Sequence, residues 1–258
     1  MFFIDTHCHI DFEWFDEDRA EVVEKAKQEN VKYLVNIGCE TRSNIKVRTN
    51  SQTFENVFYT AGIHPSDVEE ETDDVFQQII DFSKDEKMVA VGEIGLDYYK
   101  YDNDRSVQKH FFKKAIETAH QINKPIVVHD RDAHEDVYTL LKDGNVSSIG
   151  GVMHCFGGDA TYAKEIIDLG MHISLTGVIT FKNANYDEII ETIPMERLML
   201  ETDAPFLTPH PYRGKRNDPS YLPLIAEKIA TVKGLSVEDV MTITTENAIK
   251  FFKLPIRQ

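Results

Sequence analysis

The chain has 258 residues, of which 41% are hydrophobic and 28% are charged, a balance typical of a soluble globular protein with a sizeable core. Its formal net charge of −16 at pH 7 argues against a protein that coats nucleic acid through a broad basic face. It does not exclude a phosphate-bearing substrate, because a bound divalent cation can invert the electrostatics of a site.

The compartment is predicted from what the chain lacks. No stretch resembles a secretory leader, and no run approaches the roughly 20 apolar residues of a membrane helix. The three cysteines, Cys8, Cys39 and Cys155, form no C-x-x-C pair, and their odd number argues against a disulfide framework. We therefore expect a cytoplasmic protein with no membrane partner and no obligate protein partner, whose cysteines are small buried side chains.

Eight short apolar runs follow one another along the chain, each succeeded by a polar stretch. The runs cover 2–7, 32–38, 57–63, 88–94, 126–129, 149–154, 172–177 and 198–203. Apolar residues at helical spacing predict helices over 16–30, 73–86, 106–123, 133–144, 160–170, 222–234 and 237–252. Strands that alternate with helices indicate parallel βαβ units, and eight of them predict a closed α/β barrel, a (β/α)8 TIM barrel. No linker divides the chain, so we expect one domain over 1–258, with a doubly wound open sheet as the alternative.

The first run ends in two histidines, His7 and His9. Alternate residues of a strand face the same side, so both imidazoles can reach one ion while Cys8 points away. The same alternation is expected to turn Cys155, which follows His154, away from the ion. An isolated H-x-H pair fits a solvated strand edge as well as it fits a metal site. The residues at the other strand ends distinguish these two interpretations.

Barrel enzymes build their active sites at the C-terminal ends of the strands, and here those ends carry metal-ligand residue types. They are His7, His9, His64, Glu93, His129, His154 and Asp203. The other five histidines are expected to be solvated or satisfied in the core; they are His110, His120, His134, His172 and His210. Two ions suit this set better than one, since a catalytic zinc-like ion takes about three protein ligands and keeps a position for water. Glu93 is the only carboxylate at a middle strand end, which makes it the natural bridge between two ions. The alternative for Glu93 is an ion pair inside the barrel.

We expect His7, His9, Glu93 and Asp203 around the first ion. Glu93, His129 and His154 are expected around the second ion, and His64 becomes a substrate contact because the other six residues suffice.

Two carboxylates at the site, the ligand Asp203 and its neighbour Glu201, have predicted catalytic roles. Asp203 is the best general base, because it lies beside the water that the ions activate. Glu201 precedes Asp203 by two residues on the same strand face. It is expected to orient His7 or His9 by contacting the ring on the side away from the ion. A barrel-filling carboxylate paired with a lysine or arginine is the alternative for Glu201.

The loop after Asp203 is rich in proline and carries Arg213. The planar fork of arginine suits phosphate, so we expect Arg213 to bind substrate, with Arg131 as a second contact. Phe206 or Tyr212 is expected to stack on a base. The alternatives are an ordinary solvated basic loop and aromatic packing within it.

Seven motifs occur in a fixed order over almost the whole chain: DTHCHID, GIHP, GEIGLDYY, VVHDRDA, VMHCFGG, LETDAPFLTP and YRGKRN. They resemble the successive motifs of the TatD-type metal-dependent deoxyribonucleases of the amidohydrolase superfamily. The resemblance implies a TIM barrel, divalent metal ions and trimming of single-stranded DNA from its 3′ end. It also implies that His7, His9, Glu93, His129, His154 and Asp203 are the ligands.

The identity of the two metal ions stays open among Mg²⁺, Mn²⁺ and Zn²⁺. Four imidazoles with two carboxylates suit zinc or manganese, whereas the resemblance implies activity with magnesium. The substrate also has alternatives, because the same residues suit an aminoacyl-ester or amide hydrolase such as a D-aminoacyl-tRNA deacylase. Relatives that act on small organic molecules often bridge their metals with a carboxylated lysine, so Glu93 favours the phosphodiesterase. A metal-bound interaction module without activity is the alternative outside the enzymes.

Overall fold

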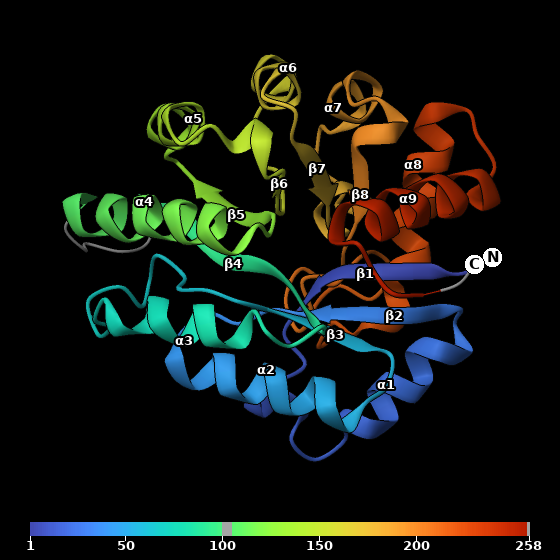
Figure 1. The fold of residues 1–258 in the computed structure, drawn as a ribbon. Coiled ribbons are helices and arrows are strands. Elements are labelled where there is room, and N and C mark those ends of the chain that lie inside the picture. Colours follow the sequence, from blue (N-terminus) through green and yellow to red (C-terminus); the bar gives the residue numbers. More distant parts are fainter. Residues whose placement is uncertain (100–104, 257–258) are drawn as a thin grey trace.

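The computed structural model describes residues 1–99 and 105–256, in which eight parallel strands form a barrel surrounded by helices (Figure 1). The strands are β1 (Phe3–Cys8), β2 (Val31–Asn36), β3 (Val57–Ala61), β4 (Met88–Asp97), β5 (Ile126–Arg131), β6 (Gly151–Met153), β7 (His172–Leu175) and β8 (Leu198–Leu200). Each strand pairs in parallel with the next one along the chain. The segment after β8 also meets β1, because the backbone N–H of Asp203 donates to the carbonyl of His7 over 2.9 Å. The single-domain (β/α)8 TIM barrel is thus confirmed, and the doubly wound open sheet is wrong.

The helices enclose the barrel, with α1, α2 and α3 below strands β1 to β3 in Figure 1 and α5, α6 and α7 at the top of the same view. Their bounds are α1 (Arg19–Gln28), α2 (Thr41–Thr53), α3 (Asp74–Phe82), α4 (Arg105–Ile122), α5 (His134–Asp143), α6 (Ala160–Asp168), α7 (Asp187–Thr192), α8 (Leu222–Lys233) and α9 (Val237–Phe252). All seven predicted helices are present within a few residues of their predicted bounds. Helices α2 and α7 were not predicted.

Helix α2 has a polar buried face, which explains why apolar periodicity does not reveal it. It buries Ser43, Asn44, Asn50 and Ser51, with Val47 as the one buried apolar side chain. The Asn44 amide donates to the Gly62 carbonyl over 3.1 Å and accepts from the Gly62 N–H over 3.0 Å. Hydrogen bonds to the strands therefore replace much of the usual apolar contact of this helix.

The interior of the barrel is apolar at its N-terminal end. Alternate strand residues form one buried cluster, which includes Ile4, Val35, Phe58, Val89, Val127, Val152 and Met199. Phe252 at the end of α9 and Leu254 just beyond it belong to the same cluster and cover it. Because side chains fill this end, as in barrel enzymes generally, the opposite end of the barrel is left for polar chemistry.

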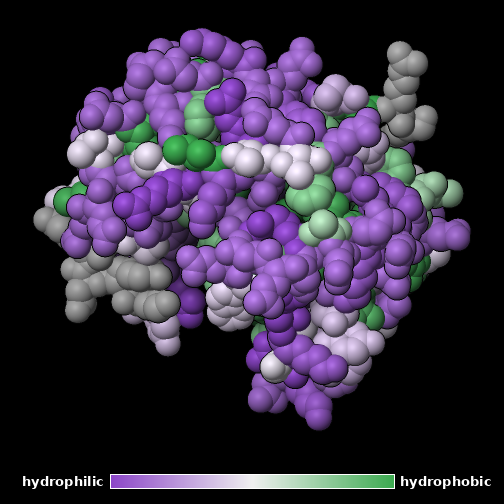
Figure 2. Space-filling model, turned by 90° about the horizontal axis from the view of Figure 1, so that it is seen from below, coloured by the Kyte–Doolittle hydropathy of each residue, from purple (hydrophilic) through white to green (hydrophobic). Residues whose placement is uncertain are grey.

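The molecular surface is mostly hydrophilic on the face shown in Figure 2, where hydrophobic groups are scattered. No helix in the described part of the chain combines the length and the apolar character that crossing a bilayer requires. Among the large hydrophobic side chains that remain exposed are Trp14, Tyr99 and Phe206. These three aromatic side chains all lie close to the polar end of the barrel described next.

Candidate metal centre

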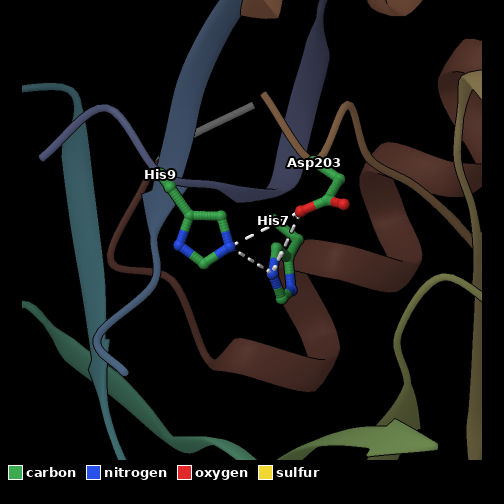
Figure 3. Close-up of side chains that lie close together, drawn as sticks. All are labelled: His7, His9 and Asp203. Carbon is green, nitrogen blue, oxygen red and sulfur yellow. Dashed lines mark hydrogen bonds and ion pairs between the residues drawn. The ribbon is translucent and has the colours of Figure 1, made fainter. Parts of the chain in front are cut away.

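His7, His9, Glu93 and Asp203 form a buried group at the C-terminal end of the barrel. The Nε2 atoms of His7 and His9 lie 3.2 Å apart, and Oδ1 of Asp203 lies 3.8 and 3.5 Å from them (Figure 3). Oε2 of Glu93 lies 3.3 and 3.8 Å from the same two nitrogens. Ligands of a tetrahedral ion with bonds of about 2.1 Å are about 3.4 Å apart, so these spacings fit one shared ion.

The second carboxylate oxygen of Glu93 faces a different group of imidazoles. Oε1 lies 2.9 Å from Nδ1 of His129, 3.5 Å from Nε2 of His154 and 3.8 Å from Nε2 of His64. Glu93 therefore stands between two sets of donor atoms, one on each oxygen, which is the geometry that a bridging carboxylate requires. His64, which we expected as a substrate contact, lies within this second group.

A local irregularity of the sheet turns Glu93 into the mouth of the barrel. The pairing of β4 with β5 shifts register between Val91 and Ile94, and such bulges redirect side chains beside active sites. The backbone of β4 also passes very close to Gly62, where an added Cβ would lie 2.4 Å from the Gly92 carbonyl carbon. Glycine at position 62 is thus required for the position of Glu93.

Glu201 lies behind two of these histidines, on the side away from the donor group. Its Oε1 is 2.8 Å from Nδ1 of His154, and its Oε2 is 4.0 Å from Nδ1 of His7. It also accepts hydrogen bonds from the Cys155 N–H and the Ser174 hydroxyl, at 2.7 and 2.5 Å. In the described part of the chain no lysine or arginine pairs with it. Glu201 therefore faces His7, as we expected, and His154, but we find no contact with His9.

Asp97 is a site residue that the sequence analysis missed. Its Oδ2 lies 3.2 Å from Nε2 of His129, opposite the nitrogen that faces Glu93. Burial disfavours the charged ring, but contacts with Asp97 and Glu93 outweigh burial and raise the pKa of His129. Asp97 follows Glu93 by four residues on one strand, so strand alternation would have revealed it had the strand been predicted to extend that far.

Two of the three cysteines lie at the site. Cys39 Sγ is 3.7 Å from Nδ1 of His9 and 4.0 Å from Oε2 of Glu93, and burial raises the pKa of this thiol to about 12. Cys155 follows the end of β6 with a left-handed backbone, φ 44°. Its sulfur lies within 4.8 Å of donor atoms of His154 and Asp203. The expectation that strand alternation turns Cys155 away is thus wrong, because the strand has already ended, whereas Cys8 does point away, toward the Val35 carbonyl.

The charge within the centre is carried by imidazoles and carboxylates. In the described ranges, neither Glu93 nor Asp203 pairs with a lysine or arginine. Burial would raise the pKa of both carboxyl groups, but the surrounding imidazoles lower the pKa of each below its usual value. Burial disfavours a charged His154, yet Glu201 and Glu93 raise the pKa of His154 to about 9. Two ionised carboxylates balanced by imidazoles alone fit a site built for a divalent cation.

A cavity of about 780 Å³ opens over the centre, and Arg131 lies on its wall. The guanidinium of Arg131 rests 4.2 Å from the centre of the exposed Tyr99 ring. His134, which we expected to be solvated or satisfied in the core, lines the same cavity, and its Nδ1 lies 2.8 Å from Asp130. The mouth therefore carries both basic and acidic side chains, because Asp130 and Asp132 line it as well.

Phe206 belongs to an aromatic group on one side of this cavity. Its ring centre lies 5.9 Å from those of both Phe12 and Trp14, and Phe12 stacks on His9 at 4.8 Å. Phe206 and Trp14 are 42% and 59% exposed, so their faces are available to a ligand. Tyr212, the other aromatic residue that we considered, stacks on Tyr221 instead.

Arg213 does not line the cavity over the centre. Its guanidinium lies 3.6 Å from the centre of the Phe181 ring, in a neighbouring cavity. Arg216 of the same loop has a structural role, because it pairs with Asp18 and donates to the Trp14 carbonyl.

Comparison with known proteins agrees with this geometry. The profile of the family described as TatD related DNase matches residues 4–253. The uncharacterized metal-dependent hydrolase YabD of Bacillus subtilis is 41% identical over 251 residues, covering 97% of this chain and 98% of the relative. The uncharacterized metal-dependent hydrolase YcfH of Escherichia coli K12 is 34% identical over 258 residues, covering 98% and 97%. The crystal structure of YjjV, a TatD homolog from the same organism, superposes with a TM-score of 0.92 at 27% identity and 98% coverage of both chains.

The barrel and its cluster of histidines and carboxylates define the class, a (β/α)8 protein with a candidate metal centre at the C-terminal strand ends. The chain belongs to the TatD family of metal-dependent hydrolases. The resemblance carried by the sequence motifs is thereby confirmed.

Proposed function

We propose that this metal-dependent hydrolase cleaves phosphodiester bonds with two divalent ions and removes nucleotides from the 3′ end of single-stranded DNA. The observation that carries the proposal is the position of Glu93, whose two oxygens face separate groups of donor atoms. Phosphodiester hydrolysis commonly uses two ions about 3.5–4 Å apart, held by shared carboxylates.

The donor groups divide the ligands between the two ions. His7, His9, Glu93 and Asp203 would hold the first ion, and Glu93, His129 and His154 the second, beside His64. Bound there, the ions lower the pKa of water and stabilise the phosphoryl oxygens as negative charge develops on them. Mg²⁺, Mn²⁺ and Zn²⁺ all accept this mixture of nitrogen and oxygen ligands, with Zn²⁺ and Mn²⁺ favoured by the imidazoles.

Asp203 is the proposed general base. Its carboxylate lies among the first group of ligands, and its lowered pKa keeps it ionised near neutral pH, as an acceptor of the water proton must be. Glu201 and Asp97 are positioning residues, because each faces the ring nitrogen of a histidine on the side opposite Glu93. Such outer contacts fix the tautomer and orientation of a ligating histidine.

Several features of the site support a polynucleotide end as the substrate. The centre is reached through a cavity of about 780 Å³, which suits one or two nucleotides better than a duplex. Phe206 lines this cavity and Trp14 lies beside Phe206, and both rings are exposed; bases of unpaired strands stack on such rings. Arg131 adds positive charge at the mouth of an otherwise acidic molecule, next to the ion pair of His134 with Asp130. A cytoplasmic location agrees with this substrate.

Oligonucleotides labelled at their 5′ end test the proposal. With Mg²⁺ or Mn²⁺ added, we expect single-stranded DNA to shorten one nucleotide at a time, faster than duplex DNA, and EDTA should abolish the reaction. Preferential cutting of closed circular DNA would instead indicate an endonuclease. Hydrolysis of a D-aminoacyl-tRNA ester without cleavage of DNA would replace the proposal with a deacylase.

A further inference from the structure

A second cavity, of about 670 Å³, lies next to the one over the metal centre. It is formed by the segment after β7 and by the loop after β8, and its lining includes Phe181, Lys182, His210 and Arg213. In TIM barrels the loops after the seventh and eighth strands frequently make a phosphate-binding site. The location of this cavity therefore favours an anionic ligand.

Two strong cations, Lys182 and Arg213, line this cavity. Among residues 1–99 and 105–256, no carboxylate pairs with Lys182 or Arg213, whereas Arg216, three residues after Arg213, is held by Asp18. The Arg213 guanidinium is held flat against the Phe181 ring, 3.6 Å from its centre. Stacking leaves the N–H groups at the guanidinium edge available, which suits bidentate contact with phosphate.

This local charge contrasts with the rest of the molecule. The chain carries 44 acidic and 28 basic residues, and a third cavity, beside α2, is lined by Glu40, Asp67, Glu70, Glu71 and Asp74. A polyanion is repelled by most of this surface. A cavity with unpaired lysine and arginine is therefore a preferred place for a phosphate group.

The two cavities are connected, since Val178 and Tyr186 line both of them. A chain that leaves the metal centre on this side passes these two residues and reaches Phe181 and Arg213 next. Phe181 and Tyr186 are half-buried aromatic side chains, and both can pack against a base or sugar along that path.

We propose that this cavity is a nucleotide subsite, in which Lys182 and Arg213 bind the backbone phosphate next to the one being cleaved. The proposal rests on the proposed function, which supplies the scissile phosphate at the metal centre. The subsite predicts that the enzyme prefers DNA strands that carry at least one phosphate besides the scissile one. A dinucleotide has no such phosphate and should be a poor substrate, whereas a hexanucleotide should be a good one.

The test compares kcat/KM for the hexanucleotide of thymidine with kcat/KM for the dinucleotide. In the wild-type enzyme we expect a ratio of about ten or more, and in Lys182→Glu and Arg213→Ala a ratio close to one. Lys182→Arg should retain the wild-type ratio. Lys215→Glu is the matched control, since Lys215 lies in the same loop but over the Tyr212 ring, and it carries the same charge change. Its ratio should stay within about twofold of the wild type, because a general loss of positive charge has only a small effect.

Binding gives a readout that does not depend on catalysis. The affinity of a fluorescent phosphorothioate hexanucleotide should fall in Lys182→Glu and Arg213→Ala but not in Lys215→Glu. In Arg213→Ala the slope of log affinity against log salt should also decrease by about 0.7, as expected for one lost single-strand phosphate contact.

Three results would overturn the subsite. They are equal kcat/KM for the two substrates in the wild type, equal losses in Lys182→Glu and Lys215→Glu, and unchanged binding in the cavity variants. If the wild type cleaves neither substrate but binds the hexanucleotide through Lys182 and Arg213, the cavity is a phosphate-binding site and the proposed function is wrong.

Discussion

Glu201 and His154 are in contact behind the metal centre, with Oε1 of the carboxylate 2.8 Å from Nδ1 of the ring. Nε2 of the same ring faces Glu93 at 3.5 Å. Glu201 thus fixes the orientation in which His154 can act as a ligand. The other carboxylate oxygen of Glu201, Oε2, lies 4.0 Å from Nδ1 of His7.

The first prediction concerns this contact. Glu201→Gln should weaken binding of Mn²⁺ by about 10- to 100-fold, because outer partners of ligating histidines have effects of this size. Titration calorimetry measures the affinity, and Glu196→Gln, an exposed residue just before β8, is the control. Equal affinities in both variants would show that Glu201 only fills the barrel.

Glu93 and Arg213 are predicted to separate metal binding from substrate binding. Glu93→Ala should lower the content of both ions, since each carboxylate oxygen faces its own donor group. Arg213→Ala should leave the metal content intact and raise KM more than it lowers kcat, as expected for a contact made in the ground state. Elemental analysis and steady-state kinetics on both variants check this, and loss of only one ion in Glu93→Ala would contradict the bridge.

Metal binding is predicted to release protons. With its pKa near 9, His154 is protonated at neutral pH in the metal-free protein, whereas a ligating imidazole has to be neutral. Metal affinity should therefore rise with pH between about 7 and 9 and level off above that range. Calorimetry in buffers with different ionisation heats measures the protons released, and an absence of release near neutral pH would contradict the assignment of His154 as a ligand.

Trp14 offers a direct report on stacking, because it is the one tryptophan of the chain. Its ring is 59% exposed and contacts Phe206 at 5.9 Å. We expect single-stranded DNA to quench its fluorescence, and Phe206→Ala to weaken binding by about 1–3 kcal/mol, the usual contribution of one stacked base. Tyr212→Leu is the control, since Tyr212 stacks on Tyr221. Unchanged affinity in Phe206→Ala would place the bases elsewhere.

The barrel could be predicted because the sequence pattern that indicates each strand lies within the strand itself and its immediate flanks. Short apolar runs bounded by polar stretches mark all eight strands, and most helices bury an apolar stripe. Helix α2 was not predicted because its buried face lacks an apolar stripe: Asn44 and Asn50 form hydrogen bonds there instead. Helix α7 covers only Asp187–Thr192, which is too short for a helical period to repeat.

The site could be predicted only as far as strand ends identify it. Parallel strands bring their C-terminal ends together, so the side chains of His7 and Glu93 were expected to be neighbours although 86 positions separate them. Asp97 was missed because β4 extends three residues beyond the predicted end. Cys39 was missed because its ordinary role is a buried apolar one, although it directly follows the second predicted strand and contacts His9.

The central claim is that hydrolysis depends on two divalent ions bound at this centre, and metal stoichiometry measured together with turnover tests it most directly. The metal-free protein should be inactive on single-stranded DNA, and activity should return as Mn²⁺ or Mg²⁺ is added, reaching its maximum at about two bound ions per chain. Well under one ion per chain after such additions, with no gain in activity, would contradict the account.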